Sequence, residues 1–388
     1  MKSLFGLSLL GLLASLMSLP LLSQNAPSAP AISQLSDFSC NSNFSSCPKG
    51  FDPTLSPIQL ADGYFYGVTW WAGFGSSNNG GTVWKATVSG QVIALHTFDF
   101  NSSGKFPNGE NPVIGFIAGA DGNLYGTTES GGSANQGVMY KLTPSGSFQV
   151  LHNFCTLPGC PDATAPLILG KDGNFYGAQF QTVFELTPQG VWSQIYLLSS
   201  STGRFLGRLI QGADGNFYGS ARSATQICSD FIFRLTPSGQ FTILYNFPEL
   251  EQVTSNLIQA SDGNFYGGGT SGIFRLTPSG GFKIIHVMTP AQGQSPTFLL
   301  QASDGNLWGL SSEGGTAPNR PGTLFALATA GTFLTSEEFD CTKNGCNPSG
   351  MVEGSDGNFY GNAVTGGSAP NRNPLGTFFK VAVGLPGR

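Results

Sequence analysis

Short apolar runs recur along the chain, and turns rich in Gly, Pro, Asp and Asn separate them. A typical unit has an aliphatic run (NLIQAS, 256–261), then NFYG (264–267) and GIFRLTPSG (272–280), and it closes on a run such as FTILYNF (241–247). Each run has the length of a β-strand, so a unit predicts four antiparallel strands, named A to D here. Neither face of these runs is consistently polar, which predicts sheets that neighbours bury on both sides.

The unit occurs seven times, and an Asp-Gly pair marks each copy just after strand A. The pairs begin at Asp62, Asp121, Asp172, Asp214, Asp262, Asp304 and Asp356. Their separations of 42 to 59 residues lie in the range of four-stranded propeller repeats. An aliphatic residue four positions before each aspartate aligns strand A in all copies: Ile58, Ile117, Ile168, Ile210, Ile258, Leu300 and Val352. The pattern predicts an all-β, seven-bladed β-propeller with four-stranded blades.

The two ends of the chain are expected to complete one blade together. After Asp356 only strands B and C follow, ending in GTFFKVAVGLPGR (376–388), whereas AISQLSDFSC (31–40) reads as a strand D without its own blade. Pairing this N-terminal strand with the last blade closes the ring and removes an open sheet edge. We therefore expect one propeller domain over residues 31–388.

The Asp-Gly pairs are interpreted as turns. Asp262 and Gly263 suit the centre of a type I′ hairpin, and the TPSG stretches suit type I turns. Phe265 and Tyr266 should point to opposite blade faces, and Gly267 should permit close backbone approach. The alternative, a repeated calcium loop, is disfavoured because one aspartate per turn supplies too few oxygen ligands.

The strand order puts the AB and CD turns on one face, called the corner face, and the BC and DA loops on the other, called the long-loop face. The BC loops of blades 6, 7, 1 and 2 are the long ones, and these blades are neighbours in a closed ring. Binding residues commonly lie on such loops. The candidate ligand-binding residues are Trp70, Trp71, Asn319, Arg320, Asn371 and Arg372. As alternatives, the tryptophans pack under their own loop and the arginines are solvated surface charges.

The residues that carry most hydrolytic chemistry are scattered. His96, His152 and His286 all fall in strand D of different blades, so they should not converge on one metal or substrate, and no Ser-His-Asp arrangement is readable. No acid or histidine stands at the positions six and seven before each Asp, which should form the channel rim. Acid-base chemistry would need loop carboxylates, of which the candidates are Glu110, Glu129, Asp162 and Glu313.

Amides recur three positions before the aspartate in four copies, and a glutamate holds that position in the last: Gln59, Gln211, Gln259, Gln301 and Glu353. They either line the central channel or bond to neighbouring backbone. We favour backbone bonding, because buried amides normally find such partners.

Composition and charge exclude several partners. Gly 55, Phe 31 and only 10% charged residues are typical of a turn-rich, aromatic-packed β protein. A net charge of -5 without any basic run argues against nucleic acid and against an anionic membrane surface. We expect no cofactor and a monomer.

The N-terminus and the cysteines predict export. Lys2, the apolar run 4–22 and SQNAPSAP have the layout of a secretory signal peptide over residues 1–28, with an uncleaved anchor as the alternative. Six of the seven cysteines form close pairs, which we interpret as disulfides rather than zinc ligands: Cys40 with Cys47, Cys155 with Cys160, and Cys341 with Cys346. Cys228 is left over as a buried free thiol.

The combination of LIQ-x-x-DGNFYG, a G-T-V-F-x-LTPSG-like strand C and a closing LHxF resembles the GloVer tandem-repeat proteins over nearly all of the expected mature chain. The resemblance implies a propeller in an exported bacterial protein and lends no catalytic residues. The chain ends at GLPGR without a sorting tail, so we expect release into the periplasm or medium. The leading hypothesis is a non-enzymatic recognition or scaffold module that binds an extracellular glycan or protein. The alternative is a polysaccharide lyase or glycoside hydrolase that uses loop carboxylates.

Overall fold

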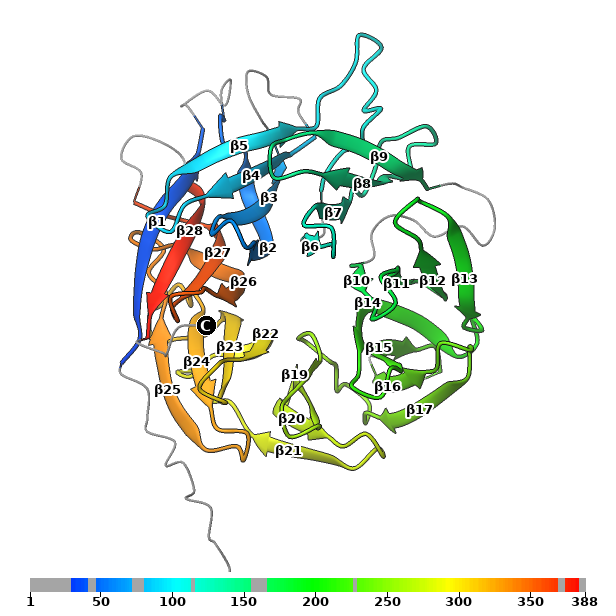
Figure 1. Ribbon diagram of the computed structural model, residues 1–388. Coiled ribbons are helices and arrows are strands. Elements are labelled where there is room, and N and C mark those ends of the chain that lie inside the picture. The colour runs from blue at the N-terminus through cyan, green and yellow to red at the C-terminus, as the bar shows by residue number, and fades with distance from the viewer. Residues whose placement is uncertain are drawn as a thin grey trace, which may run out of the picture.

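Seven four-stranded antiparallel sheets stand around a central axis in the computed structural model, which describes residues 29–40, 47–71, 80–112, 116–154, 166–225, 229–368 and 374–383 (Figure 1). The expected seven-bladed β-propeller is confirmed. The signal peptide predicted over residues 1–28 lies outside the described residues. Within the described ranges, no helix is long and apolar enough to span a membrane.

The strands of each blade are given from the innermost to the outermost. Blade 1 has β2 (Phe51–Gln59), β3 (Phe65–Trp71), β4 (Thr82–Ala86) and β5 (Val92–Thr97); blade 2 has β6 (Ile117–Ala118), β7 (Leu124–Thr127), β8 (Val138–Leu142) and β9 (Phe148–Asn153). Blade 3 has β10 (Ile168–Leu169), β11 (Phe175–Gln179), β12 (Thr182–Leu186) and β13 (Trp192–Leu197); blade 4 has β14 (Gly203–Gln211), β15 (Phe217–Ser223), β16 (Asp230–Leu235) and β17 (Phe241–Asn246). Blade 5 has β18 (Ile258–Gln259), β19 (Phe265–Gly269), β20 (Gly272–Leu276) and β21 (Phe282–His286); blade 6 has β22 (Gln294–Gln301), β23 (Leu307–Glu313), β24 (Thr323–Leu327) and β25 (Phe333–Glu338). Blade 7 has β26 (Cys346–Glu353), β27 (Phe359–Thr365), β28 (Pro374–Ala382) and β1 (Ala31–Ser39).

The N-terminal strand closes the ring, as the sequence predicts. β1 pairs antiparallel with β28 from Ala31 opposite Ala382 to Ser39 opposite Pro374. Phe38 of this strand is fully buried, and its ring lies 5.4 Å from that of Trp84 in blade 1. The first strand therefore completes blade 7 and packs against blade 1 at the same time.

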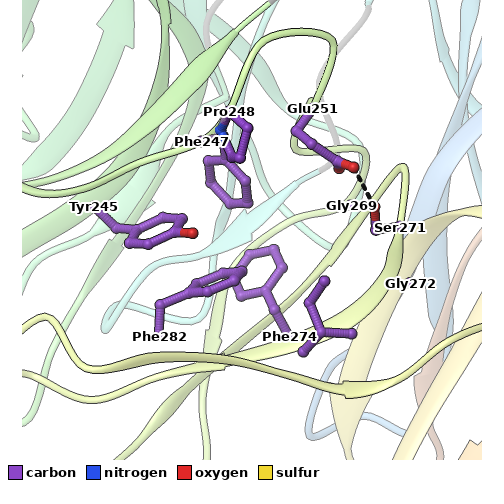
Figure 2. Close-up of a pocket in the computed structure, with 10 residues that line it drawn as sticks. Tyr245, Phe247, Pro248, Glu251, Gly269, Ser271, Gly272, Phe274 and Phe282 are labelled. Atoms are coloured by element: carbon purple, nitrogen blue, oxygen red, sulfur yellow. Dashed lines mark hydrogen bonds between the residues drawn. The ribbon is translucent and has the colours of Figure 1, made fainter.

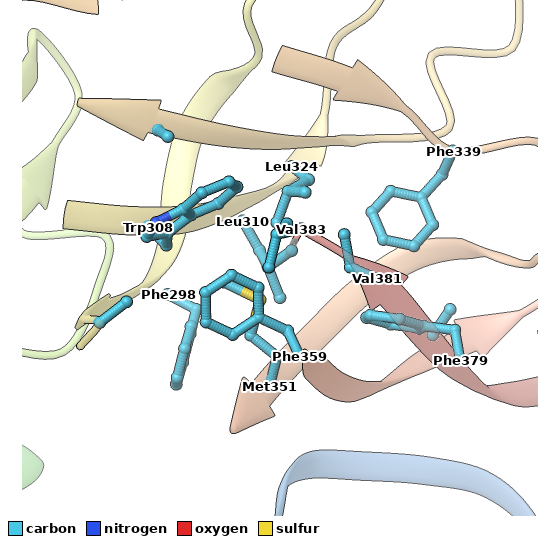
Figure 3. Close-up of a cluster of buried hydrophobic side chains, with 13 residues drawn as sticks. Phe298, Trp308, Leu310, Leu324, Phe339, Met351, Phe359, Phe379, Val381 and Val383 are labelled. Atoms are coloured by element: carbon cyan, nitrogen blue, oxygen red, sulfur yellow. The ribbon is translucent and has the colours of Figure 1, made fainter. Parts of the chain in front are cut away.

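Aromatic residues of strand B hold neighbouring blades together. Phe265 stacks on Tyr218 of blade 4 at 4.2 Å, while Tyr266 packs toward blade 6 in a cluster with Leu299. This confirms that adjacent residues of strand B point to opposite faces. Figure 3 shows one such cluster between blades 6 and 7, in which Trp308 lies beside Phe359. The core is thus a ring of packed interfaces between blades.

The glycine that follows each strand B aromatic pair makes room for a side chain. A Cβ on Gly267 would lie 2.5 Å from Cζ of Phe274 in strand C. Close approach of another backbone was expected at Gly267, but an aromatic ring occupies the space instead. The other six blades repeat this ring contact, as with Gly67 against Trp84.

The type I′ turn predicted at the Asp-Gly pairs is wrong. Gly263 has φ +81°, but the φ of Asp262 is not positive. Gly263 N–H donates to the Ala260 carbonyl, and Ala260 N–H donates to that of Asn264. This is the pattern of a type I turn followed by a left-handed glycine, and the TPSG turns share it. The longer connection lets the aspartate side chain fold back over the turn.

Each corner aspartate ties its turn to strand B. In blade 5, Asp262 Oδ1 accepts the Asn264 N–H at 3.0 Å and Oδ2 accepts the Tyr266 hydroxyl at 2.7 Å. Burial and the bond to Asp262 raise the pKa of Tyr266 to about 12. The repeated aspartate therefore has a structural role, and among the described residues no group of three or more His, Cys, Asp or Glu side chains is placed to hold a metal.

Amide side chains link the corner of one blade to the next. Gln259 Nε2 donates to the Gly263 carbonyl of its own corner at 2.9 Å, and its Oε1 accepts the Ala213 N–H of blade 4 at 2.7 Å. We call this bridge a clasp. Gln59, Gln211 and Gln301 form the same clasp, and the Glu353 carboxylate accepts the Ser303 N–H. The expectation that these residues bond to backbone is confirmed.

Two of the three predicted disulfides are formed. They join Cys40 to Cys47 and Cys341 to Cys346. Cys155, Cys160 and Cys228 lie outside the described residues.

Candidate functional site

The two faces of the propeller differ as expected. Leu124 at the start of β7 pairs with Leu142 at the end of β8, so the turns after strands A and C share the corner face. The BC and DA loops lie at the opposite ends of the strands. In blade 6 a long BC loop runs from the end of β23 to the start of β24.

Trp70 and Trp71 end β3 on the long-loop face. Trp71 is 42% exposed and Trp70 is half-buried, and their rings lie 6.2 Å apart at 55°. One aromatic face is therefore open to solvent in blade 1. Asn371 and Arg372, the counterparts predicted in blade 7, lie outside the described residues.

Asn319 and Arg320 occupy the BC loop of blade 6. Arg320 is exposed, has φ +45° and donates from Nη1 to Gln294 Oε1 at 3.3 Å. Asn319 lines a hollow of about 340 Å³ together with Ala317, Glu338, Phe339, Asp340 and Cys341. Blade 7 separates this hollow from Trp70 and Trp71, so the structure does not bring the predicted residues into one pocket.

The carboxylates of this blade 6 hollow are held by hydrogen bonds. Glu338 accepts the Thr316 N–H at 2.8 Å and the Ala317 N–H at 2.7 Å, and these bonds lower its pKa although burial opposes them. Asp340 accepts bonds from Lys343 and Thr342, which lower its pKa strongly. Both groups are ionised acceptors at neutral pH. Sequence reasoning missed them, because neither belongs to a repeated motif.

Of the four loop acids proposed as catalytic candidates, Glu110 and Glu129 lie on neighbouring backbone segments, since Glu110 forms a β-bridge with Ser130. Glu110 Oε2 accepts the Ser130 hydroxyl at 3.0 Å, and Glu129 contributes its backbone N–H to Asn111. Glu313 ends β23 and is exposed, and Asp162 lies outside the described residues.

Asp52 is an acidic residue that the sequence did not single out. It lies in β2 beside Phe51, which pairs with Trp71, so it belongs to the long-loop end of blade 1. Its φ is +63°, and burial raises the pKa of its carboxyl. Asp52 is thus a half-buried acid with a raised pKa at the same end of blade 1 as the exposed Trp71, and a general acid needs such a raised pKa.

The histidines are structural, as expected. They lie in outer strands, where a ring stacks on the phenylalanine that opens the next blade's outer strand: His96 on Phe148 at 4.0 Å and His286 on Phe333 at 5.4 Å. Tyr245 on Phe282, at 3.9 Å, repeats the contact. His152 Nδ1 lies 3.0 Å from the Gly190 carbonyl.

A small aromatic pocket opens between the outer strands of blades 4 and 5. Figure 2 shows the rings of Tyr245, Phe247, Phe274 and Phe282 around a cavity of about 100 Å³. Glu251 at its edge accepts bonds from Thr270 and Ser271 in the short BC loop of blade 5. Phe247 and Phe274 are buried at the base of the rings, and Tyr245 and Phe282 are partly exposed.

Solved structures of several named enzymes share the fold of this chain. "Streptogramin B lyase structure" shares 16% identity and a TM-score of 0.61, covering 92% of this chain and 99% of that one. A catalytically inactive histidine-to-alanine virginiamycin B lyase from Staphylococcus aureus with quinupristin shares 16% identity and a TM-score of 0.58, covering 91% and 99%. Puromycin hydrolase shares 12% identity and a TM-score of 0.58, covering 87% and 53%. At these identities the likeness concerns the fold alone.

No curated protein sequence matches the chain. A family model does match, over residues 31–204 and 268–384, which together make up most of the chain and include the first and last blades. Because the match covers more than half of its residues, the chain belongs to the Gloeobacter/Verrucomicrobia repeat family.

Proposed function

We propose that the protein is an exported recognition module that binds an extracellular glycan or protein through its long-loop face. The blade 6 hollow carries this proposal. It places an amide, Asn319, beside two carboxylates that are ionised and fixed by hydrogen bonds, Glu338 and Asp340. Carboxylates and amides in fixed positions bind hydroxyl groups, and a glycan presents many of them.

Several features support binding in preference to catalysis. A general acid needs a pKa near the working pH, and the carboxyls of Glu338 and Asp340 have lowered pKa values. The histidines stack in outer strands, so a mechanism that depends on a histidine near the axis has no counterpart here. Trp71 adds an exposed ring, which suits stacking on a sugar.

The two described disulfides support export, because such bonds persist in oxidising compartments. A periplasmic or secreted bacterial protein that acts as a monomer fits the proposal. No cofactor enters it.

A glycan array probed with the folded protein tests binding, and reducing-sugar release from the same glycans tests turnover. We expect retention of a defined set of glycans without release. Asn319→Ala, Glu338→Gln and Trp71→Ala should each weaken retention about tenfold if their groups touch the ligand. Lys283→Ala, on the outer strand of blade 5, is the matched control. Release of sugar without any retained glycan would overturn the proposal.

The second candidate is a polysaccharide lyase or hydrolase, which Asp52 favours through its raised pKa. If this alternative holds, Asp52→Asn should abolish sugar release while leaving thermal unfolding nearly unchanged. Release that persists in this variant excludes Asp52 as the acid.

A further inference from the structure

Among the described residues the clasp is missing at both junctions of blade 2, where Ala118 and Leu169 hold the clasp position, and a hollow opens at the junction of blades 2 and 3. Leu169 stands in blade 3 at the position that Gln211 and Gln259 hold in blades 4 and 5. By analogy with those clasps, a glutamine at position 169 would accept the Ala120 N–H of blade 2 and donate to the Gly173 carbonyl of blade 3. Within the described ranges, neither of these two backbone groups makes a hydrogen bond. The donor and the acceptor that one primary carboxamide joins in blades 4 and 5 are therefore left open here.

A hollow of about 410 Å³ lies at this junction on the corner face. Ala120, Leu169 and Gly173 line it, together with Asp121, Asp172 and Asn174. The two open backbone groups thus belong to the wall of a cavity that can accept a ligand from solvent. The lining is mixed: Leu169 is apolar, and Asp121 and Asp172 carry carboxylates.

The charges around this hollow also differ from those of other corners. In blades 1, 2, 4, 5 and 7, a basic residue of strand C pairs in register with the corner tyrosine: Lys85, Lys141, Arg234, Arg275 and Lys380. In blade 3 that residue is Glu185, opposite Tyr176. Asn174 Nδ2 donates to Glu185 Oε1 at 2.5 Å, and Asp172 Oδ2 accepts the Tyr176 hydroxyl at 2.6 Å.

The carboxylates of blade 3 are not neutralised by a basic side chain. Lys141 pairs with Asp121 at 2.8 Å, but in the part of the chain that the structure describes no ion pair includes Asp172 or Glu185. Hydrogen bonds keep the pKa of Asp172 below its usual value although burial opposes them. Asp172 therefore makes the blade 3 wall of the hollow negative at neutral pH, and Glu185 is bonded to Asn174 of the same wall.

We propose that this hollow binds a primary carboxamide carried by a positively charged ligand, such as a glutamine or asparagine side chain in a basic peptide. The ligand oxygen takes the Ala120 N–H and its NH₂ group donates to the Gly173 carbonyl. The positive charge lies against Asp172 and Glu185. The site is on the corner face and does not depend on the function proposed for the long-loop face.

Titration of the isotope-labelled protein with three small probes tests the ligand class, with the Ala120 and Gly173 amide signals as the readout. Glycinamide carries both features, acetamide lacks the charge, and glycine methyl ester lacks the NH₂ donor. At about pH 6 both amines are protonated. We expect glycinamide to bind at least about fivefold tighter than either of the other probes, since each lost bond or charge costs about 1 kcal/mol. Equal shifts from the amide and the ester would overturn the proposal.

Substitution at the junction tests the site itself. Leu169→Gln should restore the clasp and abolish glycinamide binding, whereas Leu169→Met keeps the size of the side chain and should leave binding unchanged. Glu185→Lys gives blade 3 the basic residue that five other blades have at this position. It should reduce the preference for glycinamide over acetamide even with Leu169 in place. Undiminished binding in the folded Leu169→Gln protein contradicts the proposal, and so does an unchanged preference in Glu185→Lys.

Discussion

The Ser355 N–H donates to Gln59 Oε1 at 2.8 Å, although the two residues are 296 positions apart in the chain. Gln59 also donates to the Gly63 carbonyl of its own corner at 3.0 Å. This clasp joins blade 7 to blade 1 on the corner face, at the same junction where β1 completes blade 7. The clasp therefore adds a connection near the axis to the one that β1 makes at the outer edge.

Gln59→Leu should lower the free energy of unfolding by about 1 to 3 kcal/mol, because it leaves a donor and an acceptor without their partner. Urea unfolding followed by tryptophan fluorescence measures the change. Gln301→Leu breaks the same kind of clasp between blades 5 and 6 and should have a similar effect. An unchanged stability in both variants would show that water replaces the amide fully.

Phe38→Ala should destabilise the protein by about 3 to 5 kcal/mol, since this fully buried ring packs against Trp84 across the closing junction. The measurement is thermal unfolding together with size-exclusion chromatography, because an open ring exposes a strand edge and should associate. Phe100→Ala is the control, as that ring is 40% exposed and should cost little. Equal losses in the two variants would argue against the closing role of β1.

Gly263→Ala should cost about 1 to 2 kcal/mol, because the residue has φ +81° and a side chain is strained there. No atom lies within 4 Å of the added Cβ, so the loss reports backbone conformation alone. Gly263→Asn should cost less, since asparagine tolerates this region. Thermal unfolding ranks the two variants, and the opposite order would contradict the turn geometry.

His96 should make stability depend on pH. Burial lowers its pKa to about 4 in the folded protein, compared with an ordinary value of 6.5. The unfolded chain therefore binds a proton first as the pH falls, and stability is lost between about pH 6.5 and 4, by roughly 3 kcal/mol at most. His96→Phe keeps the stack on Phe148 and should flatten this part of the profile. Urea midpoints across the range check it, and an equally steep profile in His96→Phe would contradict the prediction.

Much of the fold could be predicted from the sequence because the same pattern of residues recurs seven times. The spacing of the corner aspartates, the aliphatic residue before each and the unpaired strand near Phe38 predicted blade number, strand order and closure, all of which are confirmed. The turn type was missed at Asp262, because an Asp-Gly pair satisfies both a type I′ turn and a type I turn with a left-handed glycine. The φ of Asp262 and the hydrogen bonds between the flanking backbone groups distinguish them.

The candidate sites were harder to predict from the sequence, because they lie where one blade differs from the others. Asn319 was expected on the long-loop face, but its carboxylate neighbours Glu338 and Asp340 belong to no repeated pattern. Leu169 looks like an ordinary apolar residue until the clasps of the other blades show what it replaces. A departure from a repeat has meaning only once the contacts of the repeat are known.

The sequence by itself determined the architecture of this protein: an all-β ring of seven similar units, closed by its own first strand. Local turn chemistry and strand periodicity depend on neighbours in the chain, so they can be read along it. Only the tertiary structure decided that glutamines join the corners, that Glu338 and Asp340 border a hollow with Asn319, and that a cavity opens beside Leu169. These features are made by side chains from different blades, and their separation is set by the packing between blades rather than by position in the chain.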